Sequence, residues 1–204
     1  MKSYLLSLAF LLVICYEATS QEDRTINKNN DLPYRQIPDY PDSYTPENVA
    51  ARLIDGLGYR YFWATEGLTQ KDLDYKPGNG GRSTLETINH IYGLSRTILN
   101  GSLNKPNVYP RAEHNHTFAE IRKLTLENFE SASKALKKRD SNSMENLKII
   151  SKSQQGTNES PYWNMLNGPI SDAIYHTGQV VSFRRSSGNP INPKVNVFSG
   201  RTAE

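Results

Sequence analysis

The segment STLETINHIYGLSRTILNG, residues 83–101, decides the fold. Its apolar residues recur every three or four positions, which is the spacing that places side chains on one face of an α-helix. Ser83 is a preferred N-cap residue, and Glu86, three positions later, completes a capping box. Gly101 is of the residue type that commonly ends a helix. The predicted buried face comprises Leu85, Ile88, Ile91, Tyr92, Ser95 and Leu99. The segment therefore predicts an amphipathic helix that needs helical partners.

Two further segments have the same periodicity. Residues 45–68 begin with Thr45 as a cap and a proline at the first helical position. Residues 117–139 begin with Thr117 as a cap and have Glu120 in the capping-box position. The buried face predicted for the first of these segments comprises Val49, Leu53, Leu57, Tyr61 and Ala64. Both segments predict long amphipathic helices.

A fourth helix is predicted over residues 161–185, with a bend at Gly168-Pro169, because proline removes a helical hydrogen bond. The polar connection 140–160 suggests at most one short helical piece, around residues 144–150. No segment shows a convincing alternation of apolar and polar residues, so we predict no strands. Four long helices predict an all-α, four-helix bundle over residues 45–198, with extended N- and C-terminal segments, 21–44 and 199–204.

The N-terminus has the pattern of a secretory signal peptide. Lys2 precedes an apolar run from Leu5 to Ile14, and Ala18-Thr19-Ser20 supplies small residues before Gln21. We expect residues 1–20 to be removed and the mature chain to be exported, either to a periplasm or out of the cell. Removal would also take away the single cysteine of the chain, so the mature fold would depend on a packed core rather than on disulfides.

Charge excludes one class of partner. The formal net charge of +3 is too small to indicate nucleic-acid binding. As partners we expect a small-molecule substrate or ligand, no nucleic acid, and no membrane after signal removal. Helical bundles commonly pair, so a homodimer is compatible with the sequence, although no segment marks an interface.

Two of the four histidines lie among apolar residues of predicted helices. His90 belongs to the second helix and His176 to the fourth, where Asp172 precedes it by four residues. Positions four apart lie on one face of a helix, so Asp172 and His176 can converge on one point. With His90 from a facing helix they would offer a divalent metal two imidazoles and a carboxylate, leaving coordination positions open. Zinc, iron, manganese and nickel all suit these ligands.

Other interpretations stay open at this stage. Asp172 and His176 could form a plain hydrogen bond inside the bundle. Glu86 lies one turn before His90. Besides its capping role, it could be a fourth ligand, a partner that orients His90, or a catalytic base. His114 and His116 lie in a polar loop and are expected to be solvated.

The basic pair Arg184 and Arg185 also has two interpretations. It could interact with the dipole of the predicted helix that it ends, or clamp an anionic substrate.

Two of these segments resemble a known family. STLETINHIYGL (83–94) and DAIYHTGQVVSFRRSSGNP (172–190) are similar to the conserved helices of DinB-like (DinB/YfiT-like) proteins, and DLDYKPGNGGRST (72–84) resembles the linker of that family. The resemblance covers about residues 45–198. It implies a four-helix bundle that holds a divalent metal through three residues, here His90, Asp172 and His176. The chain departs from the usual pattern at Asp172, where the family commonly has histidine.

The activity that this resemblance implies is broad, because the family includes thiol-dependent transferases, isomerases, hydrolases and members without assigned activity. An exported member would meet little low-molecular-weight thiol. We therefore expect a metal-dependent hydrolase or transferase, with a non-catalytic metal- or ligand-binding bundle and a structural bundle without metal as the alternatives.

Overall fold

The computed structural model describes residues 32–78, 80–140 and 143–203. The chain divides into two units, residues 1–32 and 33–204, and every described helix and strand belongs to the second. This unit is mainly helical with small sheets, so the expectation of an all-α fold was too simple. The expected signal peptide, residues 1–20, lies outside the described residues.

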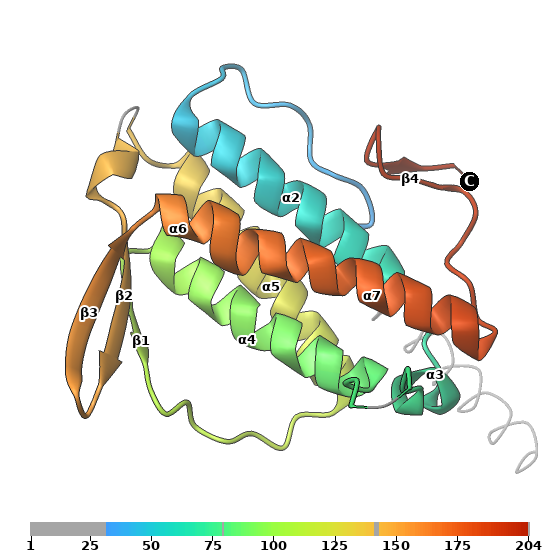
Figure 1. Ribbon diagram of the computed structural model, residues 1–204. Coiled ribbons are helices and arrows are strands. Elements are labelled where there is room, and N and C mark those ends of the chain that lie inside the picture. The colour runs from blue at the N-terminus through green and yellow to red at the C-terminus, as the bar shows by residue number, and fades with distance from the viewer. Residues whose placement is uncertain (1–31, 79, 141–142, 204) are drawn as a thin grey trace, which may run out of the picture. The chain divides into compact units, whose positions relative to one another are not determined.

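Four long helices dominate the structure (Figure 1). They are α2 (Pro46–Thr65), α4 (Thr84–Ser102), α5 (Phe118–Lys137) and α7 (Ser171–Ser187). Helix α2 packs against α5 and α7, and α4 packs against the same two helices. Within the described part of the chain, no helix has both the length and the apolar character that a membrane span requires.

Three of these helices begin where the sequence predicts. The hydroxyl groups of Thr45, Ser83 and Thr117 accept hydrogen bonds from backbone N–H groups in the first turn, at 3.2, 3.1 and 3.3 Å. In α4 and α5 a glutamate three positions later completes a capping box. These local signals need no tertiary contact, which is why the sequence identified them correctly.

The shorter helical pieces are α3 (Gln70–Asp74), η1 (Ser143–Asn146), α6 (Trp163–Met165) and the π-helical turn η2 (Leu166–Ile170). Gly168, just before Pro169, departs from helical geometry with φ −98° and ψ −105°. The predicted bend at Gly168-Pro169 is therefore confirmed. The bend lies within η2, between α6 and α7, and α7 begins at Ser171.

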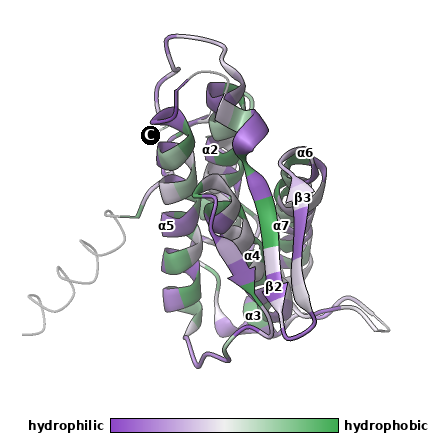
Figure 2. Ribbon diagram, turned by 90° about the vertical axis from the view of Figure 1, so that its left-hand side faces the viewer, coloured by the Kyte–Doolittle hydropathy of each residue, from purple (hydrophilic) through white to green (hydrophobic). Residues whose placement is uncertain are grey.

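Two small sheets correct the prediction that the chain has no strands. Strand β1 (Pro106–Val108) pairs in parallel with β2 (Lys148–Ser153), which pairs antiparallel with β3 (Gly156–Pro161). Figure 2 shows β3 mainly in the colours of polar residues, beside an apolar stretch of β2. The polar hairpin lacks the alternation that identifies strands in a sequence, and its pairing with β1 joins segments about 40 residues apart.

The C-terminal segment also forms a hairpin, where an extended tail was expected. Strand β4 (Val195–Asn196) pairs with β5 (Arg201–Thr202). The Tyr59 hydroxyl donates a 2.8 Å hydrogen bond to the backbone oxygen of Arg201, and the amide of Ile37 donates to the oxygen of Gly200 at 3.0 Å. The first bond attaches the hairpin to α2, and the second attaches the segment before α2 to the hairpin.

Side chains from α2, α4 and α5 fill the core. Its largest fully buried members are Tyr59, Tyr61, Phe62, Phe129, Ile54, Leu57, Ile88, Ile91, Ile98, Ile121, Leu126 and Leu136. Two residues predicted to lie on the buried face of α2 do not: Val49 is 54% exposed and Leu53 is 40% exposed. Helix α2 therefore buries Leu57 and Tyr61 of that face and leaves its first two turns partly uncovered.

Two arginines complete the C-terminal end of α2. The last carbonyl oxygens of a helix lack partners within it, and α2 has no basic residue in its own last turn. The guanidinium group of Arg184, on α7, donates to the oxygens of Trp63, Ala64 and Glu66 at 3.0, 3.1 and 2.9 Å. Arg122, on α5, is paired with the carboxylate of Glu66. Arg184 therefore interacts with the C-terminal end of the α2 dipole. One of the two interpretations of the sequence had placed this interaction on the helix that Arg184 itself ends.

A buried carboxylate attaches α3 to the end of α7. Asp72 is 1% exposed and accepts hydrogen bonds from the hydroxyl of Ser187, from the Asn189 amide at 2.7 Å, and from Thr69. Burial alone would raise the pKa of Asp72, but these donors outweigh it and hold the pKa well below its ordinary value.

Replacing Arg184 should destabilise the fold without involving the histidines. In Arg184→Met the apolar stem remains, but buried carbonyl oxygens at the end of α2 lose their donor. We expect the free energy of unfolding, measured with urea, to fall by about 3 kcal/mol. The adjacent Arg185 is exposed, so Arg185→Met should change it by less than about 0.5 kcal/mol. Equal losses in the two variants would contradict the capping role.

The buried Asp72 predicts a defined pH dependence. Its folded pKa lies below its unfolded pKa of about 3.9, so its stabilisation is present above that pH and is lost as the pH falls through the folded pKa. Asp72→Asn should cost about 2 kcal/mol at pH 7, and this cost should shrink steadily below about pH 4. Thermal unfolding between pH 2 and pH 8 measures this difference, with the exposed Asp74→Asn as control. A cost that does not vary with pH would contradict it.

Candidate metal centre

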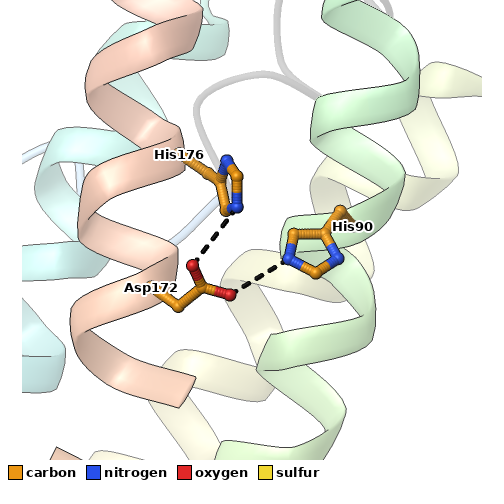
Figure 3. Close-up of side chains that lie close together, drawn as sticks. All are labelled: His90, Asp172 and His176. Atoms are coloured by element: carbon orange, nitrogen blue, oxygen red, sulfur yellow. Dashed lines mark hydrogen bonds and ion pairs between the residues drawn. The ribbon is translucent and has the colours of Figure 1, made fainter. Parts of the chain in front are cut away.

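The structure brings His90, Asp172 and His176 together (Figure 3). His90 lies in the second turn of α4, and Asp172 and His176 lie one turn apart near the start of α7. The pairing of α4 with α7 makes the two helices present these side chains to one another. One nitrogen from each imidazole and one carboxylate oxygen all lie within 4.8 Å of one another. The residues that the sequence singled out therefore form a group that could hold a metal ion.

Asp172 is the centre of this group. One carboxylate oxygen, Oδ2, lies 3.1 Å from Nε2 of His90, and the other, Oδ1, lies 3.3 Å from Nε2 of His176. The two imidazole rings meet edge to face, with centroids 4.6 Å apart and planes at 87°. Both Nε2 atoms therefore face the same carboxylate from different directions, as Figure 3 shows.

The group is accessible from solvent on one side. The side chains of Asp172 and His90 are 40% and 32% exposed, whereas that of His176 is 12% exposed. Tyr175, 64% exposed, lies beside His176 with ring centroids 5.3 Å apart. His176 is thus held within the protein, while the carboxylate and the second imidazole can be reached by a small molecule.

Gln179 holds the Nδ1 side of the His176 ring. Its amide oxygen lies 2.7 Å from Nδ1 of His176, and its amide nitrogen donates to the Tyr175 hydroxyl at 3.4 Å. The amide oxygen is only an acceptor, so in this orientation Nδ1 carries a proton, and Nε2 is left to bind a cation or, when protonated, to donate to Asp172. We did not assign this orienting role to Gln179 from the sequence, although a glutamine three positions after the histidine on a helix is a signal for it.

Nε2 of His176 and a carboxylate oxygen of Asp172 lie 3.3 Å apart. Such a contact requires a proton or a cation between the two atoms. Ligands arranged tetrahedrally at about 2.0–2.1 Å around one ion are separated by about 3.3–3.4 Å. The nitrogen–oxygen distances of 3.1 and 3.3 Å correspond to that separation. The two distances involve different oxygens of Asp172, and the three ligand atoms lie within 4.8 Å of one another, so the side chains suit a divalent ion in donor type and lie close enough to converge on one.

Glu86 is engaged elsewhere. Its carboxylate accepts a 2.6 Å hydrogen bond from the backbone N–H of Ser83 and lies 3.9 Å from the ammonium of Lys76. The hydrogen bond from Ser83, followed by the charge of Lys76, lowers the pKa of Glu86. A general base that works near neutral pH benefits from a raised pKa, so this environment favours the capping role. Glu86 is not part of the His90–Asp172–His176 group.

Two other residue pairs from the sequence lie apart from this group. His114 and His116 are exposed in the loop before α5, where they stack at 4.7 Å and lie against Tyr92. Arg184 is buried at the end of α2, so it is not available to clamp a substrate, and Arg185 is exposed.

A mainly helical protein with a His–Asp–His group between two helices is the class that the fold and the site define. The model of the DinB family matches residues 58–196, which include all three of these side chains. The chain belongs to the DinB family. Comparison with curated proteins gives no match, and comparison with solved structures gives none either.

The contact with Gln179 predicts an unusual tautomer for His176. In protein freed of metal by a chelator, at about pH 8, nitrogen NMR should show the proton of His176 on Nδ1. Gln179→Leu removes the acceptor, so the proton should move to Nε2, where Asp172 can accept it. Gln70→Leu, an exposed glutamine on α3, serves as control and should leave the tautomer unchanged. An Nδ1 without a proton in the parent protein would contradict the assigned orientation.

Proposed function

We propose that this protein is a divalent-metal-dependent hydrolase or transferase whose metal is held by His90, Asp172 and His176. The observation that carries the proposal is the grouping of His90, Asp172 and His176, whose ligand atoms lie within 4.8 Å of one another and whose two Nε2 atoms face the same carboxylate. A plain Asp–His hydrogen bond would explain the contact with His90. For His176 such a hydrogen bond would require a proton on each ring nitrogen, because Nδ1 already donates to Gln179.

Each residue has a distinct role in this proposal. His90 and His176 would each supply one nitrogen from different helices, and Asp172 would supply oxygen and partly neutralise the charge. Gln179 orients His176 through Nδ1 and increases the basicity of its other nitrogen. A divalent ion held there would acidify a water molecule or polarise a substrate carbonyl. The exposure of Asp172 and His90 leaves the solvent side of the centre open to a small-molecule substrate.

Further elements of the proposal concern context. We propose that α2, α4, α5 and α7 constitute the four-helix bundle implied by the family resemblance, supported by the packing of each against two of the others. We also propose that the protein acts after export, supported by the apolar run and small residues within 1–20. Its partners would be a small-molecule substrate and, as a homodimer, a second copy of the chain, but neither nucleic acid nor a membrane.

Elemental analysis tests the metal centre directly. Protein purified without chelators or a polyhistidine tag should contain close to one divalent ion per chain. Asp172→Ala and His176→Ala should each lose it, with affinity falling more than about 100-fold, because losing a ligand should exceed the 10–100-fold effect of losing its supporting partner.

Matched controls separate this effect from a general loss of acidic or imidazole groups. Asp74→Ala and His114→Ala alter exposed residues outside the group and should retain the ion. A parent protein without metal, which takes up none of zinc, iron, manganese or nickel on incubation, would overturn the proposal. Turnover of esters, amides or thiol acceptors by the loaded parent, absent in His176→Ala, separates an enzyme from a non-catalytic metal-binding protein.

A further inference from the structure

A second site lies away from the metal centre, where the start of α2, the turn η1, the end of β3 and the turn α6 meet (Figure 1). A pocket of about 460 Å³ opens there. Pockets that bind small molecules commonly have volumes of about 300–1,000 Å³. None of His90, Asp172 and His176 lines it. The pocket is therefore large enough for a ligand of its own.

The walls of this pocket carry apolar side chains that the fold leaves uncovered. Val49 and Leu53, one turn apart on α2, are 54% and 40% exposed, and Trp163 of α6 is 76% exposed. Periodicity predicts Val49 and Leu53 as core residues, but the described chain provides no element that covers them. Exposed apolar side chains gathered at a concavity commonly mark a binding site.

The remaining lining residues select a type of ligand. Tyr44, Tyr162 and Trp163 are aromatic, and the faces of aromatic rings attract cations. Glu145 is the one charged residue among the described residues that line the pocket. The hydroxyl of Tyr162 lies 3.2 Å from that of Ser102, which fixes this ring at the pocket wall.

A second carboxylate adds negative charge behind the wall. Glu47 is 1% exposed and accepts hydrogen bonds from the amides of Ser143 and Met144, at 2.8 and 3.2 Å. Its other carboxylate oxygen has no hydrogen-bond partner among the described residues. Burial raises the pKa of Tyr162, and the hydrogen bond with Ser102 and the charge of Arg139 oppose that shift. Arg139 itself does not line the pocket. Aromatic rings, apolar walls and carboxylates together favour an organic cation over an anion.

We propose that this pocket binds a small organic cation, an amine or quaternary ammonium ion with an apolar body, whose apolar part covers Val49 and Leu53. The cationic end lies among the aromatic rings and Glu145. The site is independent of the metal centre, because the two share no residue.

Isothermal titration calorimetry with three probes of equal chain length tests this proposal: hexyltrimethylammonium, 1-hexanol and hexanoate. The ammonium ion should bind about tenfold more tightly than the alcohol, and hexanoate should bind most weakly. Glu145→Gln should weaken the ammonium ion about threefold and leave the alcohol unchanged. Trp163→Leu, which stays apolar, should also act on the ammonium ion selectively. Both residues are exposed, so thermal unfolding should show unchanged stability.

Two variants outside the pocket serve as controls. Glu159→Gln alters an exposed carboxylate of β3 that does not line the pocket, and His176→Ala alters the metal centre, so both should bind all three probes like the parent. Equal affinity for ammonium ion and alcohol, or no binding of the ammonium ion at millimolar concentration, would overturn the proposal. So would self-association of the parent that Val49→Asp abolishes, because a second copy would then occupy this face.

Discussion

The attachment of α7 to the end of α2 through Arg184 is the constraint on which the site depends. Arg184 donates to three carbonyl oxygens that helix geometry leaves without partners, so the attachment is directional. At 100° per residue, His176 and Asp172 lie about 80° and 120° around the helix from Arg184. Once Arg184 faces α2, the other two therefore face the neighbouring helix α4 and His90.

Helix α7 is consequently polar on two faces, which explains why it is the least clearly amphipathic of the long helices. One face contributes Arg184 and Ser187 to the buried network with Asp72, and the other contributes Asp172 and His176. Ala173, Thr177 and Val180 remain to pack in the interior. Directed hydrogen bonds to α2 and α3 therefore hold the C-terminal part of this helix, while its N-terminal part presents Asp172 and His176 to α4.

The parts that could be predicted are those encoded locally. Thr45, Ser83 and Thr117 identify helix starts because a cap acts within four residues, and the spacing of Asp172 and His176 places them on one face. His90 could be added only by supposing that its helix faces α7, which the family resemblance supported. Strands β2 and β3 were missed because this largely polar hairpin lacks apolar–polar alternation, and the pairing of β2 with the distant β1 leaves no local pattern. Val49 and Leu53 were misassigned because periodicity identifies an apolar face but not what covers it.

Aspartate at position 172 gives this site a property that histidine would not. An imidazole offers one nitrogen, whereas the carboxylate presents a separate oxygen to each of His90 and His176. It also carries a negative charge, so a divalent ion held by these three side chains would leave the centre with a net charge of +1 rather than +2. A less positive centre attracts anions more weakly, and it is also a weaker Lewis acid toward neutral donors. Compared with histidine at this position, aspartate therefore reduces the preference of the centre for an anionic ligand.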